Sequence, residues 1–126
     1  MVLIHKIVLY GLLGFVGISL LIPGLMELLK LEPGNPGLML ISTDAKNQFR
    51  ALYAMMAGVG ILALWACMDL EDARKLVLGL GVIMALTAVA RGYSIFVDGV
   101  PSVISQLYLF TETVLALVFL LWPPPA

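Results

Sequence analysis

Long apolar runs alternate with short polar segments along the chain, and four of the runs have the length of membrane-spanning helices. We place them at about residues 7–25, 49–68, 76–96 and 103–122. About 20 apolar residues in an α-helix are needed to cross roughly 30 Å of hydrocarbon. The pattern therefore predicts four transmembrane helices in a single domain that occupies residues 1–126.

The polar segments between these runs predict the connectivity. Residues 69–75 and 98–102 are short turns, which requires the helices that they join to run antiparallel. Residues 27–47 form the one long connection, with turn-forming Pro and Gly at 31–37 and a short apolar stretch at 38–41. The predicted fold is an all-α, antiparallel four-helix transmembrane bundle.

Pro23 and Gly24 interrupt the last part of the first apolar run. Proline removes a helical hydrogen bond and glycine favours helix ends. We expect the first helix to end or to kink at this dipeptide.

Composition narrows the function classes. Hydrophobic residues make up 62% and charged residues 12% of the chain, which excludes a water-soluble monomer. The net charge of −1 gives no basic surface for nucleic acid. The single Cys67 cannot form a disulfide within the chain, and Cys67 and His5 are too few for a zinc or haem site. A Ser/His/Asp triad would have to use His5, which lies at the opposite end from the other polar residues, so we expect no metal, no cofactor and no catalytic residues.

An even number of helices places both termini on one side of the membrane, together with residues 69–75; we call this the terminal side. Residues 27–47 and 98–102 lie on the opposite, loop side. Lys6, Arg74 and Lys75 outnumber the lysines of the long connection, Lys30 and Lys46, so the positive-inside rule favours cytoplasmic termini.

Small residues at four-residue spacing predict where helices pack closely, either within the chain or between two copies of it. They lie in the second and third predicted helices, as Ala54 and Gly58, Gly81 and Ala85, and Ala88 and Gly92.

Three charged residues lie inside the predicted spans, where a charge costs about 2.5–3.5 kcal/mol on insertion scales. They are Arg50, Arg91 and Glu112. Antiparallel connectivity puts all three in the loop-side half of the bundle. We predict a buried Arg91–Glu112 pair with Arg50 nearer the interface.

Polar side chains at helical spacing extend these three positions into stripes that converge on one interior site. The stripes include Tyr53 in the second helix, Thr87 and Ser94 in the third, and Ser105 and Tyr108 in the fourth. Three interpretations are open: an ion pair that only fixes helix packing, a polar pocket for the head of a lipophilic molecule, or proton transfer through Glu112.

Several residues in order resemble a bacterial four-helix membrane family, known as domain of unknown function 4345. They are Asn47-Gln48-Phe49-Arg50-Ala51-Leu52-Tyr53, Leu64-Trp65-Ala66, Arg91-x-x-Ser94, Asp98-Gly99-x-Pro101-Ser102 and Glu112. The resemblance runs from about Asp44 to Trp122, departs from the family at Gln48, where a glutamate is usual, and implies the four-span fold without an activity.

We therefore expect a non-enzymatic protein of the bacterial inner membrane, either an accessory subunit of a membrane complex or a binder of a lipophilic molecule. Its partners would be the bilayer and either an intramembrane protein, a second copy of the chain or a lipid-like or quinone-like ligand held by the Arg/Glu cluster. A proton-coupled transporter or channel that uses Glu112 is the alternative, and a membrane enzyme is a third.

Overall fold

A computed structural model describes residues 1–29 and 43–125, and within these ranges the regular structure is entirely helical. Each of the four α-helices is long and apolar enough to cross a membrane, as predicted. The elements are α1 (Leu3–Leu29), α2 (Thr43–Met68), the short 3₁₀ helix η1 (Leu70–Asp72), α3 (Arg74–Asp98) and α4 (Val103–Leu121).

The first two helices are longer than the sequence pattern predicts. Helix α1 continues through Pro23 to Leu29, and α2 already begins at Thr43, so the predicted connection 27–47 is too long at both ends. The turn-rich stretch 31–37 and the apolar stretch 38–41 lie outside the described residues.

Gly24 explains why α1 does not end at the Pro-Gly dipeptide. A Cβ atom on Gly24 would lie 2.9 Å from both the Ala57 nitrogen and the Tyr53 carbonyl oxygen of α2. The two backbones are thus in direct contact one residue beyond Pro23. Packing against a neighbouring helix stabilises helical backbone around a proline in apolar helices.

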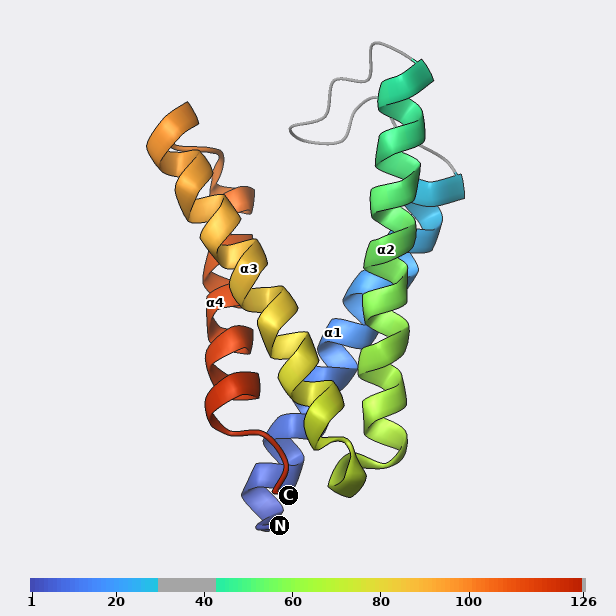
Figure 1. The fold of residues 1–126 in the computed structure, drawn as a ribbon, viewed down its shortest axis with the longest axis vertical. Helices are drawn as coiled ribbons and strands as arrows, with labels where there is room; N and C mark the ends of the chain where they lie inside the picture. Colours follow the sequence, from blue (N-terminus) through green and yellow to red (C-terminus); the bar gives the residue numbers. More distant parts are fainter. Residues whose placement is uncertain (30–42, 126) are drawn as a thin grey trace.

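The helices form two antiparallel hairpins, α1–α2 and α3–α4 (Figure 1). The hairpins meet at the terminal side, where both chain ends and η1 lie, and they diverge toward the loop side (Figure 1). The fold is therefore a splayed bundle, closed at one end.

Glycines set the close contact within the first hairpin. A Cβ on Gly60 of α2 would lie 2.6 Å from the Leu21 nitrogen and 2.7 Å from the Gly17 carbonyl oxygen of α1. Ala54 is exposed and Gly58 has open space around it, so this predicted pair does not pack against another helix of the described chain. The contact uses the face around Gly60 and Ala57 instead, because α1 crosses α2 on that side.

The second hairpin follows the prediction in part. Gly81 is buried, with a would-be Cβ 2.8 Å from Leu120 of α4, and Ala85 packs against the buried core. Ala88 is half-buried. Gly92 has open space around it because the packing surface does not extend that far toward the loop side.

The apolar core lies in the terminal half of the molecule and draws on all four helices. In contrast, no residue between 85 and 114 is buried, although this stretch contains the loop-side halves of both α3 and α4. Prominent core side chains are Leu9, Leu13 and Val16 of α1, Ala63 and Ala66 of α2, Val77, Leu80 and Met84 of α3, and Leu115, Ala116 and Phe119 of α4.

Polar contacts join segments distant in sequence at the terminal side. His5 stacks on Trp122, with ring centroids 4.2 Å apart, and its Nε2 lies 2.7 Å from the Trp122 carbonyl oxygen. Arg74 donates a 2.8 Å hydrogen bond to the Pro124 carbonyl oxygen. These contacts fix the chain's last residues against the starts of α1 and α3.

An exposed ion pair adds to this closed end. Lys6 of α1 lies 3.0 Å from a carboxylate oxygen of Glu71 in η1. The hydrogen bond and the charge of Lys6 lower the pKa of Glu71 below its usual value.

Candidate functional site

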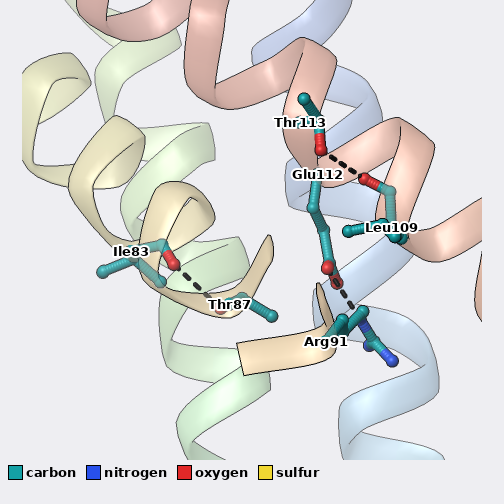
Figure 2. Close-up of polar contacts among 6 residues, drawn as sticks. All are labelled: Ile83, Thr87, Arg91, Leu109, Glu112 and Thr113. Carbon is teal, nitrogen blue, oxygen red and sulfur yellow. Dashed lines mark hydrogen bonds and ion pairs between the residues drawn. The ribbon is translucent and has the colours of Figure 1, made fainter. Parts of the chain in front are cut away.

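Arg91 and Glu112 form an ion pair between α3 and α4, as the sequence predicts. The Arg91 Nε atom donates to Glu112 Oε2 over 2.7 Å (Figure 2). The Glu112 side chain is 16% exposed and that of Arg91 36%. A contact this short between charged groups is a strong, charge-assisted hydrogen bond.

Helical spacing explains why these two residues meet. Arg91 lies seven residues after the buried Met84, and Glu112 lies seven residues before the buried Phe119. Each charged residue therefore continues the core-facing stripe of its own helix toward the loop side. The stripes that pack the apolar core at the terminal side bring Arg91 and Glu112 together where that core ends.

Tyr108 is the third member of the site. It precedes Glu112 by one helical turn, and the guanidinium carbon of Arg91 lies 5.2 Å from the centroid of its ring. This distance is within the range of cation–π attraction. The tyrosine therefore covers one face of the guanidinium while Glu112 binds its Nε.

The two terminal guanidinium nitrogens of Arg91 take no part in the ion pair. Neither Nη1 nor Nη2 has a hydrogen-bond partner among residues 1–29 and 43–125. Figure 2 shows these nitrogens on the side of the guanidinium turned away from Glu112. The site therefore has an open edge with N–H donors of fixed geometry.

Arg50 does not join this pair, contrary to the predicted convergence of three stripes. Its Nη1 donates to the carbonyl oxygen of Leu28, in the last turn of α1. The Tyr53 backbone likewise lies against Gly24 of α1. Both residues belong to the first hairpin, which diverges from α3 and α4 at the loop side (Figure 1).

The other predicted polar residues make local contacts or none. Thr87 donates to the Ile83 carbonyl oxygen of its own helix over 2.8 Å (Figure 2). Ser94 donates to Asp98 over 2.9 Å. Ser105 is half-buried and has no side-chain hydrogen bond within the described part of the chain. In the described part of the chain, none of these residues forms a hydrogen bond with the ion pair.

Asp98, which the sequence pattern assigns only to a turn, is the hydrogen-bond partner of Ser94. Its four-residue spacing from Ser94 on a helix is the signal that indicates their contact. The contact holds the last turn of α3 and lies about two turns beyond Arg91.

Two apolar grooves lie elsewhere on the surface, and neither is lined by Arg91 or Glu112. One, of about 380 Å³, lies between α3 and α4 and is lined mainly by alanine and leucine; the other, of about 320 Å³, lies along α2. In the described ranges, no group of three or more His, Cys, Asp or Glu could hold a metal ion.

The sequence profile of a protein family, Domain of unknown function (DUF4345), matches residues 8–123. The chain belongs to the DUF4345 family. The match begins within α1, so this family relationship covers the first helix as well as the later residues on which the resemblance was recognised. No curated protein and no solved structure shows a significant match to the chain.

Chemically, the Arg91–Glu112–Tyr108 site is a neutral donor site. The carboxylate balances the guanidinium charge, and the open edge of Arg91 offers N–H groups to an acceptor.

Proposed function

We propose that this protein binds a lipid-like or quinone-like molecule in the membrane, with the polar head of the ligand at the open edge of Arg91. The observation that carries the proposal is the arrangement of the guanidinium, which Glu112 orients through Nε while both Nη nitrogens lack partners in the described part of the chain. Donors left without partners in an apolar environment are costly, and a ligand acceptor offsets that cost.

The unburied surface around the pair supports the same proposal. Residues 85–114 include no buried residue, and this stretch contains Arg91, Tyr108 and Glu112. A molecule that lies here would contact the inner stripes of α3 and α4 without displacing core side chains. Binding sites between helices of a bundle commonly combine such apolar surroundings with a few polar groups.

Binding is better supported than ion passage through Glu112. On the terminal side of the pair, the inner stripes of α3 and α4 are occupied by Met84, Leu115 and Phe119, which are all buried. Proton or ion transfer across a membrane requires polar groups along the whole path. We further propose that the protein lies in the bacterial inner membrane with both termini in the cytoplasm, an orientation that the lysine and arginine distribution favours.

The test is purification in mild detergent followed by mass spectrometry of co-purified small molecules. We expect a lipophile with the wild-type chain and about tenfold less with Arg91→Gln, since one charge-assisted hydrogen bond is lost. Arg50→Gln is the matched control, because Arg50 lies in the other hairpin and donates a hydrogen bond to the Leu28 carbonyl group.

Equal recovery of the lipophile from wild type and Arg91→Gln would overturn the proposal. A stoichiometric protein that co-purifies in place of a small molecule would instead indicate an accessory subunit of a membrane complex.

A further inference from the structure

We propose that the ligand head at this site is a neutral carbonyl group of the quinone type and not an anionic phosphate or carboxylate. This inference rests on the proposed binding function and specifies its ligand class. It follows from the charge balance of the ion pair, from the part of the guanidinium that is open and from the depth of Arg91 in its helix.

The charge balance of the ion pair favours a neutral ligand head. Arg91 already has a carboxylate 2.7 Å from its Nε, and that carboxylate is largely shielded from solvent. An anionic head would give the site two negative charges against one positive charge. An unmatched charge in apolar surroundings is strongly unfavourable, whereas a neutral acceptor leaves the site neutral.

The open Nη edge of the Arg91 guanidinium has the shape to bind a carbonyl oxygen. With Nε bound to Glu112 and one face of the guanidinium beside the Tyr108 ring, the Nη edge is the part of Arg91 that can receive a ligand. A single carbonyl oxygen accepts hydrogen bonds along its two lone-pair directions, so it can receive N–H groups from both Nη nitrogens. The aromatic ring of Tyr108 also offers a stacking surface to a flat head.

The depth of Arg91 in α3 distinguishes a quinone from a phospholipid ester. Arg91 lies seven residues before Asp98, the last residue of α3, which is about 10 Å from the helix end at about 1.5 Å per residue. Glycerol ester carbonyls are tethered to a charged headgroup that stays at the interface. A carbonyl at the depth of Arg91 therefore belongs to a molecule without a charged head.

Three probes with the same decyl chain test this inference on the purified full-length chain: a decyl-benzoquinone, decyl phosphate and decylbenzene. Occupancy is measured by native mass spectrometry in competition. We expect the quinone to bind wild type about tenfold more tightly than decyl phosphate, and decylbenzene to remain at background.

Glu112→Gln should abolish this preference. Removal of the carboxylate leaves the Arg91 charge unmatched, so the apparent affinity for decyl phosphate should rise about tenfold. Glu71→Gln is the matched control, since it removes a carboxylate from an exposed ion pair at the opposite end of the molecule and should leave the preference unchanged.

The outcomes separate the two proposals. Tighter binding of decyl phosphate than of quinone by wild type, abolished in Arg91→Gln, would overturn the neutral head while lipophile binding stands. Binding of all three probes at the decylbenzene level would overturn the proposed function itself. If Glu112→Gln does not fold, the wild-type preference decides between these outcomes.

Discussion

Arg91 and Glu112 show how two charged residues that are each unfavourable in an apolar helix are tolerated as a pair. Alone, either charge would be exposed to hydrocarbon at considerable cost. Paired at 2.7 Å, with Glu112 only 16% exposed, they share one strong hydrogen bond and no net charge. The partial exposure of Arg91 means that this pair is worth less than a fully buried one.

We expect Arg91→Gln and Glu112→Gln each to lower the free energy of unfolding by about 1–2 kcal/mol, which is less than the cost of breaking a fully buried pair. The double variant should be more stable than the sum of the single changes predicts, because neither charge is then left alone. Denaturant unfolding in detergent of wild type, the two single variants and the double variant measures this coupling. Additive effects would show that the pair has no coupling energy.

Within each hairpin, the positions of small residues decide how closely the helices approach. Gly60 allows the α2 backbone to lie against Gly17 and Leu21 of α1, whereas Gly58, two residues earlier, faces open space. The same residue type thus has opposite roles within one helix. Helical periodicity in the sequence indicates spacing, but the direction in which the neighbouring helix lies determines which glycine matters.

Substitution of these two glycines should separate the roles. Gly60→Ala should destabilise the α1–α2 hairpin by about 1–3 kcal/mol, because the new Cβ would meet backbone atoms at 2.6 and 2.7 Å. Gly58→Ala should be neutral or slightly stabilising, since alanine favours a helix. Thermal unfolding of both variants in the same detergent provides the measurement. Equal losses would contradict the observed register of α1 on α2.

At the scale of the whole molecule, the two hairpins are joined mainly at their terminal side. The His5–Trp122 stack, the Arg74–Pro124 hydrogen bond and the Lys6–Glu71 pair lie there, beside the apolar core. Residues 85–114, in the loop-side halves of α3 and α4, include no buried residue. In the described part of the chain, the contacts between the two hairpins therefore concentrate at the terminal side.

The Lys6–Glu71 pair predicts a pH dependence of this closed end. The pKa of Glu71 is lower in the folded chain than its usual value of 4.5, so the pair contributes stability above about pH 4.5. That contribution is lost as the pH falls through the folded pKa, where Glu71 becomes protonated. Both groups are exposed, which keeps the effect small.

The measurement is the difference in unfolding midpoint between wild type and Glu71→Gln. We expect a small difference at pH 7 that disappears toward pH 3. Asp72→Asn is the control, since the Asp72 carboxylate forms no ion pair in the described residues. A difference that is constant over this range would show that Glu71 acts through packing and not through its charge.

Sequence reasoning predicted most of the fold because membrane-type helices have a strong signal. A helix must satisfy its own backbone in apolar surroundings, so length and hydrophobicity alone indicate the four helices and their antiparallel order. The ends of α1 and α2 were less predictable. Pro23 favours termination locally, but contact between Gly24 and the α2 backbone keeps α1 helical, and that contact is tertiary.

For the site, the sequence by itself determined the Arg91–Glu112 pair, because the positions of the two charges in an antiparallel hairpin place them at the same depth on facing helices. Only the tertiary structure decided that Arg50 belongs elsewhere. Its position follows from the packing of α2 against α1, which brings its guanidinium to the Leu28 carbonyl oxygen. Helical periodicity in the sequence indicates which residues share a face of one helix, but it does not indicate which distant helices are in contact.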